Sequence, residues 1–577
     1  MKILGVHDGH LATACLLEDG RVAAMASEER FTGRKNQGGI PRRAIEWVLT
    51  SSGAAGTDVD AVAVAGLMPP IADTDFYSRS RHKYFSLFSK VLPRGALANP
   101  KIYRPYIEHH RKKRARFPEL KRVLASHGIS GDKIRQVEHH EAHAATAFYL
   151  SGDRAGDDPV LVITLDGSGD GLCGTVSIGR GHSLERLKSL PSYHSLGIVY
   201  SRVTQHLGMK PLDHEYKVMG LAPYAPESLK AQAYEVFARH LALSDDGLSF
   251  ENRSGAWGNS YLGRLRRDLT LLRFDAVAAG LQQRFEDLVV PFIGRWIEKT
   301  GIRNIALAGG SFMNVKLNML LAERPEIENL FIMPSGGDES IALGAALTAT
   351  VDLCAAAGRT PVVSPLRDLY WGMDFSADEI ERTLAEYRTK ISYRSVSDIE
   401  RETAELLSRG KIVGRMKGRM EWGARALGNR SILADPSRAE TVRKINAAIK
   451  MRDFWMPFAP SILWERRRDY LEMKKDIPAP YMVLAFRSTP LAHKELIAGL
   501  HPFDLTCRPQ LVQKEWNEPY HRLLKNFEDL TGIGGVLNTS FNIHGTPIVR
   551  TPKDAIETLL NSGLDYVTIG DFLVSRA

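Results

Sequence analysis

The chain has 577 residues, of which 44% are hydrophobic and 25% charged, and this ordinary globular composition excludes a largely disordered protein. The length is too great for one core and predicts several folding units. The four cysteines lie far apart without a CxxC pair, which excludes a zinc ribbon and a disulfide framework. The start MKILGVHDGH lacks the layout of a signal peptide, so we expect a cytoplasmic protein.

The net charge of +9 is concentrated in one stretch. Between Arg79 and Arg122 there are fourteen Lys or Arg against two acids, with aromatic side chains interleaved. This pattern predicts a basic helical insertion near residues 75–125. Such a segment could be a structural cap, attract an anionic substrate, or contact RNA or a membrane.

The first elements in the chain are short strands separated by turns. Strands are predicted over Lys2–Gly5, Ala12–Leu17 and Arg21–Ser27, joined by the turns HDGH and EDG. The same outline returns after Pro159 as VLVITLDGSGDG, LCGTVSIGRG and HSLERLKSL. Two copies of one strand-and-turn pattern predict a duplicated α/β fold.

Two later junctions run from a strand into a glycine-rich loop, at Asn304–Asn314 and at Leu330–Leu347. Backbone N–H groups and a helix N-terminus both point at an anion in such a loop, so phosphate binding is expected. The apolar stretch Ile341–Gly358 contains Asp352 and is interpreted as a buried helix rather than a membrane span.

The pattern breaks between Leu353 and Gly372, which predicts a linker. We therefore expect a first domain over residues 1–355 and a second over residues 366–577. The second begins with helical patterning at Asp378–Arg388 and Ile399–Ser408 and continues with the strand KIVGRM. Both domains are predicted to be α/β or α+β.

The constellation VEHHEAHAA predicts a metal site. His139 and His143 are four residues apart and share one face of a helix, while Asp166 and Asp338 lie on turns that could complete the ligand set. Imidazole and carboxylate ligands suit iron, zinc or manganese. Helix capping by the aspartates and a surface histidine cluster are the alternatives.

Arginine and lysine side chains gather in the second domain among glycines and apolar strands, which favours a buried anion pocket over a solvated charge run. A face rich in amides and hydroxyls follows in VLNTSFNIHGTP, where Asn538, Ser540 and Asn542 alternate. The basic residues are Arg415, Lys417, Arg419, Arg425, Arg430, Lys450 and Arg452.

Together these motifs resemble the O-carbamoyltransferases of nodulation-factor and antibiotic biosynthesis. The resemblance spans nearly the whole chain, and EYKVMGLAPY and GARALGNRSILADP are its most specific parts; other landmarks are HHEAHAATAF, LAGGSFMN, MPFAPSIL and LNTSFNIHGTPIVRTPKDA. It implies a duplicated actin-like ATPase domain followed by an α+β YrdC-like domain. The second domain would join carbamoyl phosphate and ATP into carbamoyl adenylate, and the first would transfer the carbamoyl group to a hydroxyl.

The resemblance also assigns residues. His7, Arg425 and Lys450 would be catalytic, His7 as a general base or an orienting group for the acceptor. The metal ligands would be His139, His143, Asp166 and Asp338. The carbamoyl-phosphate pocket would contain Arg425, Lys450, Arg508, Asn538 and Ser540. The nucleotide would contact Gly167, Gly309, Gly310, Asn314, Lys417 and Arg419.

The implied cofactors are ATP with Mg²⁺ and one first-row metal ion, iron in preference to zinc or manganese. The implied partners are carbamoyl phosphate and a hydroxyl-bearing small molecule; nucleic acid is not expected, and a homodimer is left open. Two alternatives remain at this point. One is a tRNA threonylcarbamoyladenosine-type synthase, and the other is a nucleic-acid-binding protein whose catalytic sites have decayed.

Overall fold

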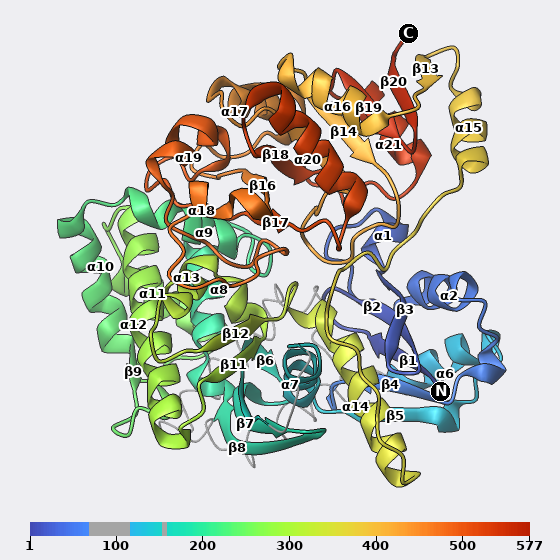
Figure 1. The fold of residues 1–577 in the computed structure, drawn as a ribbon. Coiled ribbons are helices and arrows are strands. Elements are labelled where there is room, and N and C mark those ends of the chain that lie inside the picture. The colour runs from blue at the N-terminus through green and yellow to red at the C-terminus, as the bar shows by residue number, and fades with distance from the viewer. Residues whose placement is uncertain (69–115, 153–157) are drawn as a thin grey trace. The chain divides into compact units, whose positions relative to one another are not determined.

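A computed structural model of the protein describes residues 1–68, 116–152 and 158–577 (Figure 1). Most of the predicted basic insertion therefore lies outside the described residues. The chain divides into two compact units. Unit 1 contains Met1–Glu28 and Asn36–Leu366, and unit 2 contains Glu29–Lys35 and Arg367–Ala577.

Unit 1 is built on two five-stranded sheets with one topology. In each, the first strand pairs antiparallel with the second and the second with the third, while the fourth and fifth run parallel to the first. The predicted duplication is therefore present. The orders are β3-β2-β1-β4-β5 and β8-β7-β6-β11-β12. The strands are β1 Lys2–His7, β2 Thr13–Glu18, β3 Arg21–Ser27, β4 Ala61–Ala65, β5 Ile134–Val137, β6 Val160–Gly169, β7 Leu172–Arg180, β8 Ser183–Pro191, β11 Asn304–Ala308 and β12 Asn329–Ile332.

The helices of unit 1 cover these sheets and add a helical region after β8. A short hairpin of β9 (Leu241–Leu243) and β10 (Phe250–Asn252) lies in that region. The helices are α2 Arg42–Ser51, α6 Arg116–Ser126, α7 His139–Tyr149, α8 Leu196–His206, α9 Glu215–Leu221, α10 Glu227–His240, α11 Asn259–Asp268, α12 Phe274–Thr300, α13 Val315–Ala322 and α14 Ile341–Ala356.

Helices α7 and α14 follow the last strand of each sheet and pack directly against each other (Figure 1). A Cβ atom on Gly344 of α14 would lie 1.8 Å from the carbonyl oxygen of Ala142 of α7. Only glycine allows the two backbones to approach so closely. This contact fixes the first turn of α7 relative to the loop that precedes α14.

Among the described residues one helical stretch, Asp338–Ala356, is long and apolar enough to span a membrane, and 72% of it is buried in the protein. The predicted buried helix is thus confirmed. The helix continues to Ala356, so the first residues of the predicted linker, from Leu353 to Ala356, are helical. The backbone N–H of Ala357 donates to the carbonyl of Leu353 and closes the last turn.

Unit 2 is a mixed eight-stranded sheet, in the order β13-β20-β19-β14-β15-β18-β16-β17. Successive residues point to opposite faces, as Ile432 and Leu433 of β15 show by joining two different apolar clusters. The strands are β13 Ile391–Ser395, β14 Val413–Met416, β15 Arg430–Ala434, β16 Ala459–Leu463, β17 Gln510–Val512, β18 Gly535–Ser540, β19 Tyr566–Ile569 and β20 Phe572–Arg576.

Helices cover both faces of this sheet. Helices α15 and α21 pack against one face, where Leu384 and Ile556 join one apolar cluster. Helices α16 and α20 pack against the other, where Leu407 and Phe527 join the second cluster. The α/β class predicted for both parts is confirmed, whereas the YrdC-like identity of unit 2 stays a prediction. The helices are α1 Glu29–Thr32, α15 Ala377–Glu386, α16 Ile399–Ser408, α17 Glu440–Ile445, α18 Arg467–Tyr470, α19 Pro490–Glu495, α20 Glu518–Thr531 and α21 Pro552–Leu560, with a π-helical turn at Asn446–Lys450.

The contact between α7 and α14 predicts the effect of adding one methyl group. Gly344→Ala should lower the free energy of unfolding by about 1–3 kcal/mol, because a backbone must move to admit the Cβ. Gly294→Ala in α12 is the matched control. Its Cβ would meet only a glutamate oxygen at 4.0 Å, so this substitution should be neutral or slightly stabilising. Urea denaturation measures both, and equal effects of the two substitutions would contradict the packing argument.

Candidate active sites

A cluster of two histidines and two aspartates lies in unit 1. One ligand atom from each of His139, His143, Asp166 and Asp338 can be chosen so that all four atoms lie within 4.8 Å of one another. Nε2 of His139 is 3.5 Å from Asp166 Oδ2 and 3.7 Å from Asp338 Oδ1. Nε2 of His143 is 3.9 Å from Asp338 Oδ1. The structure therefore brings together all four residues that the sequence predicted as ligands.

The duplicated topology explains how residues so distant in sequence meet. Asp166 lies near the end of β6, and His7 ends β1, the equivalent strand of the other sheet. The two histidines begin α7, and Asp338 lies in the 3₁₀ turn that leads into α14, the equivalent helix. His7 joins this cluster, with its Nε2 3.9 Å from Asp338 Oδ2.

Two neighbouring groups orient the ligands. The backbone N–H of Gly310 donates to Asp166 Oδ1 at 3.0 Å, which leaves Oδ2 directed at His139. Asp170 accepts the backbone N–H of His139 at 2.9 Å and so fixes the start of α7. Gly169 makes room for the imidazole, because a Cβ there would lie 2.1 Å from the ring of His139.

The electrostatics of the cluster are those of buried, mutually dependent charges. Burial lowers the pKa of His139, but the carboxylates of Asp166 and Asp338 raise it to about 9. Burial and the charge on His139 hold the pKa of His143 well below its usual value. Burial and the charge on Asp166 raise the pKa of Asp338 to about 6. The pKa of Asp166 is lowered by His139 and His143 against the effect of burial.

The donor set fits a divalent metal ion. Nε2 of His139 and both ring nitrogens of His143 are buried without a hydrogen-bond partner among the described residues. Buried imidazole nitrogens are normally satisfied, so this arrangement needs an explanation, and coordination supplies one. Two imidazoles and two carboxylates suit a first-row transition metal.

A cationic cluster lies in unit 2. Lys450 ends the π-helical turn with its side chain buried, and its Nζ donates to Ser540 Oγ at 2.9 Å and to Asn542 Oδ1 at 2.6 Å. Burial, and then the positive charges of Arg452 and Lys35, hold the pKa of Lys450 well below its usual value. Lys450 is thus held next to the strand β18 that carries Ser540.

Arginines add to this positive charge. Burial lowers the pKa of Arg508 well below its usual range, and the nearby guanidinium groups of Arg425 and Arg452 lower it further. Arg452 donates from Nη2 to Thr539 Oγ1 at 3.0 Å and lies over the ring of Phe458. Several cations of one sign in a poorly solvated place repel one another, and a bound anion would relieve that repulsion.

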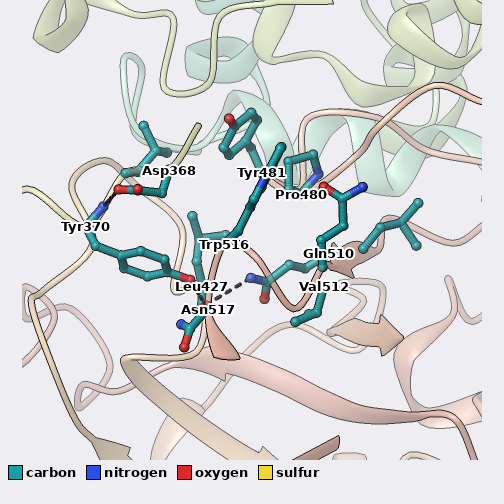
Figure 2. Close-up of a pocket in the computed structure, with 12 residues that line it drawn as sticks. Asp368, Tyr370, Leu427, Pro480, Tyr481, Gln510, Val512, Trp516 and Asn517 are labelled. Atoms are coloured by element: carbon teal, nitrogen blue, oxygen red, sulfur yellow. Dashed lines mark hydrogen bonds between the residues drawn. The ribbon is translucent and has the colours of Figure 1, made fainter. Parts of the chain in front are cut away.

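The loop 423–428 carries Arg425 and is fixed by side chains from elsewhere in unit 2. The carbonyl of Leu427 accepts from Tyr370 Oη at 2.8 Å and from Gln510 Nε2 at 2.9 Å, and these residues line a small pocket that Figure 2 shows. Asn538 donates to the carbonyl of Ala426 at 3.2 Å. Buried Glu421 accepts the backbone N–H groups of Leu427 and Arg430.

Of the residues predicted to contact the nucleotide, four lie in unit 1 and two, Lys417 and Arg419, lie in unit 2. Gly309 adopts φ +103°, and its Cβ would lie 2.2 Å from the carbonyl of Leu165, so this loop and the one containing Gly167 lie against each other. Asn314, by contrast, caps α13 and pairs with Gln282.

Lys417 and Arg419 are held by unit 2 itself. Lys417 forms ion pairs with Glu400 and Asp571, each at 2.8 Å. Arg419 donates to the carbonyls of Trp371 and Gly372. These contacts give both residues a part in stabilising unit 2, and their assignment to the nucleotide stays a prediction.

Comparisons with known proteins follow this division into two units. A family model described as the carbamoyltransferase N-terminus matches residues 2–347, and one described as the carbamoyltransferase C-terminus matches residues 404–576. The chain belongs to the carbamoyltransferase family. It is an enzyme of that class.

Relatives of this carbamoyltransferase include nodulation proteins. Nodulation protein NolNO of Sinorhizobium fredii is 31% identical, over 99% of this chain and 79% of the relative. Nodulation protein NolO of Bradyrhizobium diazoefficiens is 34% identical, over 76% of this chain and 79% of the relative. Among solved structures, (R)-2-hydroxyglutaryl-CoA dehydratase component A of Acidaminococcus fermentans matches with a TM-score of 0.31 and 15% identity, over 60% of this chain and 97% of that one.

Sequence reasoning missed several residues that support these two clusters. Asp170 and Gly169 belong to the quoted motif LDGSGDG, and the second aspartate of that motif was the available signal. Gln510 and Lys35 carry no local signal, because their role depends on contacts between distant parts of the chain.

The four-ligand geometry predicts metal content. Purified carbamoyltransferase should contain about one first-row metal ion per chain, and His143→Ala should lose most of it, because the site would lose one of its four candidate protein ligands. His140→Ala is the matched control. His140 is also buried on α7, but it is bound to Thr164 Oγ1 and stands outside the four-residue cluster. Elemental analysis decides the matter, and equal metal content in the two variants would contradict the assignment.

Proposed function

We propose that this carbamoyltransferase is an ATP-dependent O-carbamoyltransferase with two sites that work in sequence. Unit 2 would convert carbamoyl phosphate, water and ATP into carbamoyl adenylate: hydrolysis releases phosphate and leaves carbamate, whose oxygen then displaces pyrophosphate from the α-phosphate of ATP. Unit 1 would transfer the carbamoyl group to a hydroxyl of a small molecule. The proposal rests mainly on one observation, the cationic cluster around buried Lys450 of unit 2 in a chain whose other unit holds a separate His/Asp cluster.

The cationic cluster suits a substrate that carries phosphate. Arg425 and Arg508 would bind its oxygens, since guanidinium groups match phosphate geometry in pairs. Lys450 would add a point charge beside Ser540 and near Asn538, whose amide and hydroxyl neighbours suit a planar carbamoyl group. ATP enters with Mg²⁺ as co-substrate. The electrostatic field would stabilise the charge that develops on the departing groups.

In unit 1, His139, His143, Asp166 and Asp338 would hold the metal ion, iron in preference to zinc or manganese. A bound divalent ion supplies a Lewis acid there. Gly167, Gly309 and Gly310 would lie against the nucleotide, because residues without a side chain let a ligand approach the backbone closely. Exclusion of water from these buried groups would protect an adenylate from hydrolysis.

His7 would act on the acceptor hydroxyl either as a general base or as an orienting group. Its Nε2 lies 2.9 Å from the carbonyl oxygen of His10, and a carbonyl can only accept, so Nε2 carries the hydrogen. In the neutral ring Nδ1 is then the basic nitrogen. General-base catalysis of this kind typically contributes about 100- to 10,000-fold.

The acceptor is proposed to be a hydroxyl-bearing small molecule of the kind found in nodulation factors or antibiotics. Two relatives are named as nodulation proteins and share most of their length with this chain. We propose a cytoplasmic location, where carbamoyl phosphate and ATP are both supplied.

Separate half-reactions predict separate effects of substitution. Arg425→Ala should reduce release of pyrophosphate from carbamoyl phosphate and ATP by about 100-fold or more. His143→Ala should leave that release within a few-fold of the wild-type rate. Arg409→Ala, at an exposed arginine of unit 2, is the charge-matched control and should behave as wild type. A pyrophosphate-release assay distinguishes these cases. Equal losses in Arg425→Ala and His143→Ala would contradict a two-site scheme.

The lowered pKa of Lys450 predicts proton uptake. In the free enzyme Lys450 loses its proton at a lower pH than an ordinary lysine does. A bound phosphate favours the ammonium form and therefore raises the pKa of Lys450. Binding of carbamoyl phosphate should therefore take up a proton between the two values, and affinity should fall as pH rises through that window. Calorimetry in two buffers of different ionisation enthalpy measures the uptake. Lys450→Arg, which remains charged, should abolish it; unchanged uptake in that variant would refute the assignment.

A further inference from the structure

The segment Glu29–Lys35 belongs to unit 2, although the residues on both sides of it in the chain belong to unit 1. It contains the short helix α1. The side chain of Arg30 is only 8% exposed, and it lies 3.5 Å from Glu29 Oε1. The first residues of this segment therefore pack into unit 2, whereas Gly33, Arg34 and Lys35 are exposed.

Arg30 makes a direct contact with the loop that carries Arg425. Its Nη2 donates to the carbonyl oxygen of Gly423 at 2.8 Å, across 393 positions in sequence. Gly423 adopts φ +98°, a conformation that glycine reaches without steric cost, so the loop can begin with a turn at this position. A guanidinium bound to a buried carbonyl is a charge-assisted hydrogen bond, stronger than a neutral one.

The other end of the same loop is held by different groups. The carbonyls of Ala426 and Leu427 accept from Asn538, Tyr370 and Gln510. Arg425 stands between these anchors and Gly423. Arg30 holds the amino-terminal end of the loop through Gly423, next to Trp422, whose backbone N–H donates to the carbonyl of Leu369 at 2.7 Å.

One further contact and one electrostatic effect link the segment to unit 2. The guanidinium of Arg550 lies 5.3 Å from the centre of the Phe31 ring. The charge of Lys35 contributes to the lowered pKa of Lys450. The segment thus contacts unit 2 at Gly423 and at Arg550, and the charge of Lys35 acts on Lys450 of the cationic cluster.

We propose that Arg30 is a positioning residue of the anion site: it holds the loop 423–428 so that Arg425 can meet the phosphate of the substrate. The inference rests on the proposed function, in which Arg425 binds carbamoyl phosphate. It also means that a segment from the first thirty-five residues completes a site otherwise built from the last two hundred.

The test measures binding of carbamoyl phosphate to the full chain by calorimetry, with unfolding temperature followed in parallel. Arg30→Ala should weaken binding by about tenfold or more, because a charge-assisted hydrogen bond is lost, and should raise KM for carbamoyl phosphate more than it lowers kcat. Arg34→Ala is the matched control. Arg34 is an exposed arginine of the same segment, so its removal changes the net charge equally and should alter binding less than about twofold.

Equal binding by Arg30→Ala and Arg34→Ala would overturn the proposal, and so would a tenfold loss in both, since that would be a charge effect. Should Arg30→Ala fail to fold, Arg30→Gln is measured against the same criteria, since its shorter amide does not span the distance to Gly423. Absence of carbamoyl phosphate binding by the wild-type chain would instead contradict the proposed function itself.

Discussion

The close approach of α7 and α14 is the constraint on which the first site depends. Because Gly344 has no side chain, the carbonyl oxygen of Ala142 occupies the space where a Cβ of residue 344 would lie. Each helix follows the fifth strand of its own sheet, so this one contact brings equivalent ends of a duplicated fold together. The ligand residues of α7 and the aspartate before α14 then face each other without any need for a specialised loop.

The two units differ in the charges that they bring together: unit 1 pairs imidazoles with carboxylates, and unit 2 gathers cations. In unit 1, imidazoles and carboxylates compensate one another in part, and a divalent ion would complete the balance. In unit 2, cations repel cations, and Lys450 is kept in place by hydroxyl and amide oxygens. Such a like-charge arrangement lowers stability unless an anion binds, which is the usual cost of a preorganised site. The two environments therefore suit two different steps of one transfer.

Much of this could be predicted from local sequence pattern. The first three strands, the helix Ile399–Ser408 and the four clustered ligands follow from alternation, helical spacing and glycine-rich turns. The predicted face of Asn538, Ser540 and Asn542 is correct only in part, because β18 ends at Ser540. Asn542 still reaches Lys450, but from the turn beyond the strand.

Contacts between distant parts of the chain could not be predicted. The bond from Arg30 to Gly423 leaves no periodic signal, since nothing near residue 30 reveals which loop it will meet. The same holds for Gln510, whose amide fixes a carbonyl 83 residues away. Asp170 is an intermediate case: its motif was visible, but its role in holding the N–H of His139 depends on how β6 lies against α7.

The central claim is that one unit makes an acyl adenylate that the other consumes. A rapid-quench experiment with [¹⁴C]carbamoyl phosphate and [α-³²P]ATP on the His143→Ala protein tests it most directly, since transfer is blocked there and the intermediate should accumulate. The account predicts a species that carries both labels in a 1:1 ratio and reaches a substantial fraction of the enzyme concentration. Consumption of ATP without any doubly labelled species would contradict it.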